Sequence, residues 1–129
     1  MLHGIRQIVN NDSLWREMFR SMNRMFWHQT VTTKQIEKYL SDFLGRDLQK
    51  TFDQYLRTVQ IPVLEYKLKN GKLSYRWTNC VKGFNMPINI ISTGKEILIK
   101  PLDKWQSLPY ADPQLAVDPD FFVTIRKTE

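Results

Sequence analysis

The sequence predicts an α+β fold, in which antiparallel helices come first and a small antiparallel β-sandwich follows. Apolar residues recur every three or four positions through residues 1–60, which is helical spacing. From residue 61 onward they alternate with polar residues, as half-buried strands require. The change falls at Gln60-Ile61-Pro62, where the proline removes a backbone donor and blocks helix continuation. We therefore expect a helical segment over 1–60 and a β-sandwich domain over 61–129.

Two amphipathic helices are expected within residues 1–30. The first is short and ends at the polar run over 10–13, where Asp12 is placed to cap the second helix. The second helix carries an apolar face made of Leu14, Trp15, Met18, Phe19, Met22, Met25 and Phe26. We expect this face to be core, although methionines and aromatic residues also suit an adaptable binding face.

Two more helices are expected between residues 32 and 58. Thr32 and Gln35 have the spacing of a capping box, so a helix should begin there, and Gly45 stands where a left-handed residue can end it. Asp47 is placed to cap the fourth helix. The residues expected to face inward are Ile36, Tyr39, Leu40, Phe43, Leu44, Leu48, Phe52, Tyr55 and Leu56.

The second half is expected to begin with a β-hairpin. Alternating apolar residues flank Asn70-Gly71, a pair that favours the positive φ angles of a type I′ turn. Further strands are expected over 86–91, 96–100 and 121–126, because each run is rich in apolar and β-branched residues.

One proline and one loop qualify this pattern. Pro87 lies inside a predicted strand and suggests an edge or a bulge. The long loop over 101–119 contains several large apolar residues, which suggests that it is pinned to the core, with room for one more short strand.

Charge argues against a dedicated nucleic-acid or membrane surface. The chain has 129 residues and a formal net charge of +6. Residues 1–58 carry nine Lys/Arg against six Asp/Glu, and residues 59–129 carry ten against seven, so the excess is spread evenly. No long run of like charge stands out, which is typical of a solvated surface. We therefore expect neither nucleic acid nor a membrane as a partner.

The residues that could bind a metal or act in catalysis are few. His3 and His28 are the only histidines and are expected on different helices, His3 in a packed seam and His28 as a C-terminal cap. Cys80 is the only cysteine and is expected to behave as a small hydrophobic residue. Zinc needs three or four converging N, S or O ligands, and the chain contains no H-E-x-x-H motif. We therefore predict no catalytic, cofactor-binding or metal-binding residue in this chain.

Other residues have ordinary structural interpretations. Asp112, Asp118 and Asp120 could suggest calcium, but they lack EF-hand spacing, and Asp-Pro pairs commonly start turns. The four tryptophans are expected to anchor two small cores; they are Trp15, Trp27, Trp77 and Trp105.

Several segments together resemble the aminopeptidase N family of zinc metallopeptidases. Residues 52–56 (FDQYL), followed by 61–66 (IPVLEY), resemble the family's "FFDQWL" helix and the entry to its first sandwich strand. Upstream, 31–36 (VTTKQI) and 43–48 (FLGRDL) are similar to its "(I/V)-T-(T/S)-x-D-(F/W)" helix and "G-x-D-L" cap. Residues 1–6 resemble the helix that follows the family's tyrosine motif.

The resemblance implies a non-catalytic C-terminal portion of a zinc aminopeptidase. The helices would finish the helical lobe of the catalytic domain, and the sandwich would be a scaffold. The zinc-binding helix, its Glu ligand, the glycine-rich motif and the oxyanion-stabilising tyrosine would all precede Met1, so no catalytic residue carries over. Zinc and the peptide substrate would belong to the parent enzyme, and this chain alone would not be an enzyme.

The same resemblance predicts the partners and the location of the chain, and one alternative function remains. The helices near residues 1–30 would pack against the upstream catalytic domain, and without it they would expose Met and aromatic surface that could self-associate. The family favours a periplasmic or secreted location, although one cysteine is equally compatible with the cytosol. The alternative is a stand-alone protein–protein interaction module with the same architecture.

Overall fold

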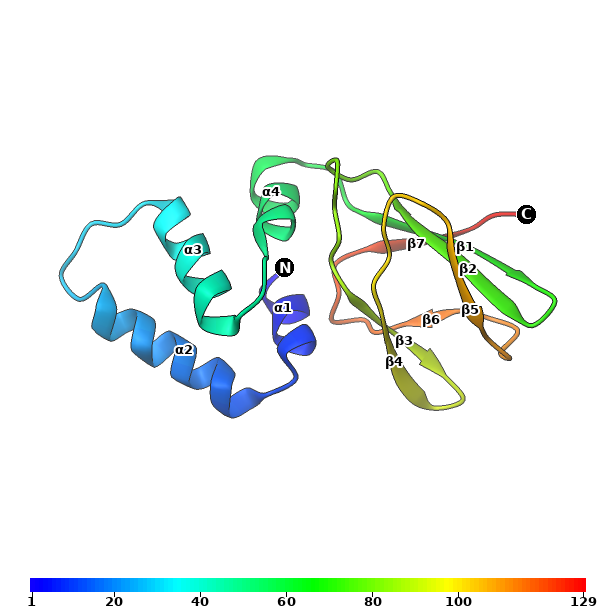
Figure 1. Ribbon diagram of the computed structural model, residues 1–129, viewed down its shortest axis with the longest axis horizontal. Helices are drawn as coiled ribbons and strands as arrows, with labels where there is room; N and C mark the ends of the chain where they lie inside the picture. Colours follow the sequence, from blue (N-terminus) through cyan, green and yellow to red (C-terminus); the bar gives the residue numbers. More distant parts are fainter.

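The computed structural model describes residues 1–129 and shows an α+β fold (Figure 1). Four helices come first: α1 (Leu2–Val9), α2 (Asp12–Met25), α3 (Thr33–Leu44) and α4 (Gln49–Arg57). Seven strands follow: β1 (Val63–Lys69), β2 (Lys72–Thr78), β3 (Ile88–Ser92), β4 (Lys95–Ile99), β5 (Gln106–Pro109), β6 (Ala116–Val117) and β7 (Thr124–Lys127). The predicted order of helices before strands is confirmed. None of the helices has the length and apolarity needed to cross a bilayer.

The helix ends show why the helical half is divided where it is. The capping box predicted at Thr32 and Gln35 is present, with both reciprocal hydrogen bonds, and Gly45 ends α3 in the left-handed conformation at φ 61°. The predicted cap of α2 is off by one residue. Asn11, not Asp12, accepts the hydrogen bond from the backbone N–H of Leu14, because Asp12 is already the first helical residue.

The start and inner face of α4 differ partly from the prediction. Asp47 accepts a hydrogen bond from the backbone N–H of Gln49 at 3.0 Å, as a residue that starts the helix should, although Leu48 occupies the cap position itself. Leu48 and Phe52 are buried as expected. The prediction that Leu56 faces inward is wrong, since it lies on the exposed side of the last turn and is largely accessible.

The sandwich is built from two sheets. Sheet A has the strand order β5-β2-β1-β7, and sheet B has the order β4-β3-β6. The predicted hairpin is confirmed, with Asn70 at φ 52° and Gly71 at φ 69° in the turn between β1 and β2. The expectation of a purely antiparallel sandwich is wrong in one place, because β7 pairs with β1 in parallel and makes sheet A mixed.

Two of the later strands are shorter than predicted, whereas β4 has the predicted length and begins one residue earlier, at Lys95. β3 begins at Ile88, directly after Pro87, since proline has no backbone N–H to donate to the ladder. β7 begins at Thr124 rather than at Phe121, because Phe121 turns into the core before the strand starts. The 101–119 loop contains two short strands, β5 and β6, where one was expected.

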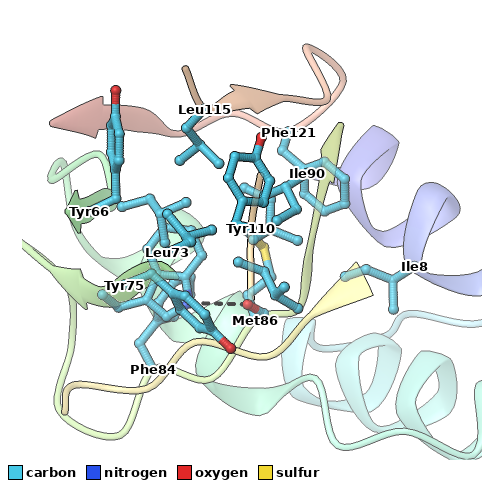
Figure 2. Packing of buried hydrophobic residues seen from close by; sticks show 14 residues of the cluster. Ile8, Tyr66, Leu73, Tyr75, Phe84, Met86, Ile90, Tyr110, Leu115 and Phe121 are labelled. Carbon is cyan, nitrogen blue, oxygen red and sulfur yellow. Dashed lines mark hydrogen bonds between the residues drawn. The ribbon is translucent and has the colours of Figure 1, made fainter. Parts of the chain in front are cut away.

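Two hydrophobic cores lie side by side and share α1. The sandwich core includes Trp77, whose indole Nε1–H donates to the backbone oxygen of Met86 at 3.1 Å (Figure 2). The helical core consists of Ile5, Met18, Leu40, Leu48 and Phe52. Ile8 of α1 belongs to the sandwich core, so this one short helix packs into both.

Candidate functional site

The two histidines lie in different places and make no common site. His3 is exposed on α1, so the expectation of a packed seam is wrong. His28 is also exposed and stands beyond the end of α2, with φ 52°, while Phe26 is the residue that ends the helix. The His28 ring packs edge-on against Trp27 with ring centroids 4.6 Å apart. The predicted capping role of His28 is therefore replaced by a role in the left-handed turn that leads out of α2.

The residues of this chain do not fit a zinc site. No three His, Cys, Asp or Glu side chains converge. The carboxylate of Asp12, which lines the same shallow depression as His3, is held by two hydrogen bonds from Arg6, at 2.9 and 2.8 Å. This ion pair lowers the pKa of Asp12 through the hydrogen bond from Arg6. Such a carboxylate is engaged with a cation and is not a free metal ligand.

The side chains of the three late aspartates accept hydrogen bonds within the chain, that of Asp120 from the Gln7 side-chain amide. Asp112 accepts hydrogen bonds from the Ser92 hydroxyl and the Thr93 backbone N–H, which fixes the turn between β3 and β4. Asp118 accepts from the backbone N–H of Asp120 at 2.9 Å. The turn interpretation of these residues agrees with these contacts.

Cys80 follows β2 and is half-buried. Burial raises the pKa of its thiol, and the negative charge of Asp103 raises it further. A thiol with a raised pKa stays protonated at neutral pH, and the thiolate is the nucleophilic form. Cys80 therefore behaves as a small, weakly polar residue packed against the sandwich core.

The apolar face of α2 is core only in part. Met18 is fully buried, as predicted, and Trp15 and Phe19 pack around it. Met25 is 57% exposed and Trp27 is 71% exposed, so the expectation that they are core residues is wrong. Trp77 is the only one of the four tryptophans that is fully buried.

Trp27 lines a groove at the end of the helical half, and Met25, the last residue of α2, precedes the groove residues Phe26 and Trp27 in the chain. The groove has a volume of about 440 Å³ and is lined by Met22, Asn23, Phe26, Trp27, His28 and Ile36. We call Met22, Met25, Phe26, Trp27 and Ile36 the helical-tip face. It lies at the turn between α2 and α3, at the end of the molecule opposite the sheets (Figure 1).

A second depression, between α3 and α4, is lined almost entirely by charged and polar side chains. The Arg57 guanidinium forms salt bridges with the carboxylates of Glu37 and Asp53, with N–O distances of 2.8 and 3.0 Å. The hydrogen bond to Glu37 is the main cause of the raised pKa of Arg57. Lys38 is likewise paired with Asp42 at 2.6 Å. Because these charges are satisfied by one another, the depression is best described as an ion-pair network between two helices.

One surface cluster was missed by counting charges in each half of the chain. Trp105, which was expected in a core, is exposed, and Lys67 and Arg76 lie over its ring. The sequence signal was the placement of basic residues at alternate positions on both strands of the hairpin, which puts them on one face.

In comparisons with known proteins, no family model and no curated protein matches this chain.

Proposed function

We propose that this chain is the non-catalytic C-terminal portion of a zinc metallo-aminopeptidase of the aminopeptidase N family. Its helices complete the helical lobe of the catalytic domain, and its sandwich is a rigid scaffold beside that lobe. The chain alone does not hydrolyse peptides. The zinc and the peptide substrate belong to the rest of the enzyme, where the metal polarises the peptide carbonyl and activates water.

The observation that carries this proposal is the helical-tip face. A large indole and a methionine at a helix end, exposed beside a groove lined mainly by apolar residues, are typical of a surface that another protein element covers. The face belongs to the helical half, which is the part that the resemblance assigns to the catalytic lobe. We therefore propose the remainder of that lobe as its occupant.

The positions of the family-like segments give further support. Residues 31–36 contain the capping box that starts α3, and residues 43–48 contain the left-handed Gly45 and end at Leu48, the N-cap residue of α4. Residues 52–56 lie within α4, and 61–66 lead into β1. Each segment thus occupies the kind of element that the resemblance implies.

The firm connection between the two halves suits a scaffold. The Tyr55 hydroxyl on α4 donates to the backbone oxygen of Phe122 at 2.8 Å, 67 positions along the chain. The methylene of Gly4 on α1 faces Phe121, and an added Cβ would lie only 3.2 Å from the Phe121 ring. Because α1 and α4 both contact the segment before β7, helices and sandwich are held in one orientation.

The alternative is a stand-alone module that binds another protein through the helical-tip face. The same groove favours it, so the structure of the face does not separate the two proposals. The two proposals differ in what covers the helical-tip face. The first requires a zinc-binding peptidase segment, and the alternative requires an unrelated protein.

The test begins with the genomic region immediately upstream of the Met1 codon. An in-frame segment that encodes H-E-x-x-H and a downstream Glu supports the first proposal. That segment is then produced separately and assayed with zinc, alone and mixed with this chain. We expect the mixture to hydrolyse aminoacyl-p-nitroanilides faster than the segment alone, and Trp27→Asp to abolish the gain. An upstream region without such a segment, or a segment indifferent to this chain, contradicts the proposal.

A further inference from the structure

The outer face of sheet A gathers most of the unbalanced positive charge of the sandwich. Strand alternation sends Leu64, Tyr66, Leu73, Tyr75 and Trp77 into the core and their neighbours outward. The charged outward residues are Lys67, Lys69, Lys72, Arg76, Arg126 and Glu65, which together we call the basic face. The other outward positions on these strands are uncharged: Val63, Ser74, Thr78, Ser107, Pro109 and Thr124.

The arrangement of the lysines does not serve the stability of the sheet. Lys69 and Lys72 are direct cross-strand partners, and like charges placed opposite each other are destabilising. Lys67 faces Ser74, so it has no acidic neighbour across the ladder. The ion pairs of the chain include none of these three lysines. None of the three is paired with a carboxylate of the chain, so each can still bind an anionic group of a partner.

The basic face already binds one carboxylate, that of the chain itself. Glu65 lies in register between Arg76 and Arg126, and the Arg76 Nε–H donates to its Oε2 at 2.7 Å. Arg126 donates to the other carboxylate oxygen. This contact shows that the spacing between adjacent strands lets two guanidinium groups hold a carboxylate from both sides.

Trp105 holds two of the cations in place. The Lys67 Nζ lies 5.0 Å from the centre of the indole ring, and the Arg76 Cζ lies 4.7 Å from it. Contacts of this kind restrict the rotamers of long side chains, which lowers the entropy lost when they bind a partner. The cations beside Trp105 are therefore partly preorganised.

We propose that the basic face docks an extended acidic segment of a partner protein, with Asp or Glu at alternate positions. Residues two apart in a strand repeat about every 6.6 to 6.8 Å, so Lys67 and Lys69 match the carboxylates of such a segment. Single-stranded nucleic acid would need aromatic rings open for stacking, and Trp105 already has two cations over its ring. The observed contact on this face is to a carboxylate, which favours an acidic polypeptide.

This proposal is independent of the aminopeptidase proposal. The basic face lies on the sandwich and points away from its core, and the helical-tip face lies at the far end of α2 (Figure 1). A variant of one face leaves the other intact, so the failure of either proposal can be recognised separately.

The experiment measures binding of a fluorescent peptide in which Glu alternates with Thr, by anisotropy at low and physiological salt. The test variant is Lys67→Glu/Lys69→Glu/Lys72→Glu. The control is Lys34→Glu/Lys82→Glu/Lys95→Glu, which changes three exposed lysines elsewhere by the same net charge. Competitors are a peptide of the same composition with its Glu residues clustered, oligothymidylate of equal charge, and phosphatidylserine vesicles.

We expect the alternating peptide to bind more tightly than the competitors. The test variant should raise the dissociation constant of this peptide about tenfold or more, and the control variant should raise it less than about twofold. Equal weakening by both variants would show a net-charge effect and overturn the proposal, as would tighter binding of oligothymidylate or vesicles. Absence of peptide binding at low salt would also overturn it. If the test variant does not fold, Lys69→Glu/Lys72→Glu keeps Lys67 beside Trp105 and must still weaken binding more than Lys34→Glu/Lys82→Glu.

Discussion

The side-chain oxygen of Gln54 accepts a hydrogen bond from the backbone N–H of Val81 at 2.6 Å. The side-chain nitrogen of the same residue donates to the backbone oxygen of Gln60 at 2.8 Å and to the Thr58 hydroxyl at 3.1 Å. Gln54 is fully buried. One amide on α4 therefore fixes both the linker into β1 and the loop that follows β2.

Replacing Gln54 by Leu should destabilise the protein by about 2 to 4 kcal/mol. The change keeps the volume but removes the side-chain partner of the Val81 N–H and of the Gln60 carbonyl oxygen; both contacts are part-buried, so each loss should cost about 1 to 2 kcal/mol, the lower part of the range for an unsatisfied group. The free energy of unfolding from urea titration measures the effect. Gln49→Leu, on the exposed surface of the same helix, is the control and should change stability by less than about 0.5 kcal/mol. Similar losses in both variants would contradict the bridging role of Gln54.

Gly4 should resist substitution by a large residue. Leucine at this position favours the helix by about 1 kcal/mol, but its Cβ would lie 3.2 Å from the Phe121 ring, and the rest of the side chain would have to fit at a buried position. We expect Gly4→Leu to lower stability by about 1 to 3 kcal/mol and to loosen α1 from the sandwich. Hydrogen exchange of the α1 amides reports this loosening directly. His3→Leu on the exposed side of α1 should leave exchange unchanged, and faster exchange in both variants would argue against a specific contact.

Glu65 should make stability depend on acid pH. Burial alone would raise the pKa of its carboxyl, but hydrogen bonds and charge from Arg126 and Arg76 outweigh burial and hold the pKa below the ordinary 4.5. The stability from this carboxylate is therefore complete above pH 4.5 and is lost as the pH falls through the lower folded-state pKa.

The variant Glu65→Gln tests this pH dependence. At pH 7 it should be less stable than the parent chain by about 1 to 2 kcal/mol, because two arginines lose a shared carboxylate and both remain partly solvated. The difference should shrink below pH 4.5, where the parent carboxyl becomes protonated. Denaturant titrations of both proteins between pH 3 and pH 7 measure it. A difference that stays constant over this range would show that the charge of Glu65 does not stabilise the fold.

The helical-tip face should make the isolated chain self-associate. Trp27 and Met25 expose apolar surface that is covered if two copies meet there. Met25→Ser/Trp27→Ser should therefore remain monomeric at concentrations where the parent chain forms larger species in light scattering. Ile97→Ser/Phe122→Ser removes two exposed apolar residues of the sandwich and is the control. A parent chain that stays strictly monomeric at high concentration contradicts this prediction.

Local signals explain most of what the sequence could predict. The capping box at Thr32, the left-handed Gly45 and the Asn70-Gly71 turn each depend on a few neighbouring residues, and each is found where expected. The parallel pairing of β1 with β7 was missed because it joins segments about 60 residues apart. Nothing in the alternation of Thr124 to Lys127 distinguishes a parallel neighbour from an antiparallel one.

The candidate surfaces were harder to predict than the elements. Trp27 follows a helical stripe and was assigned to the core, but Phe26 ends the helix, and the next residue turns outward. The basic face was missed because charge was counted along the chain, while the register of β1, β2 and β7 decides which charges meet. Helical spacing identifies a face, but burial depends on what packs against it.

The most direct test of the aminopeptidase proposal is an assay of the purified chain for hydrolysis of aminoacyl-p-nitroanilides with added zinc, combined with metal analysis of the same sample. We predict no turnover and no stoichiometric zinc, because no three potential ligands converge anywhere in the chain. Turnover that a chelator abolishes, together with bound zinc, would contradict the proposal.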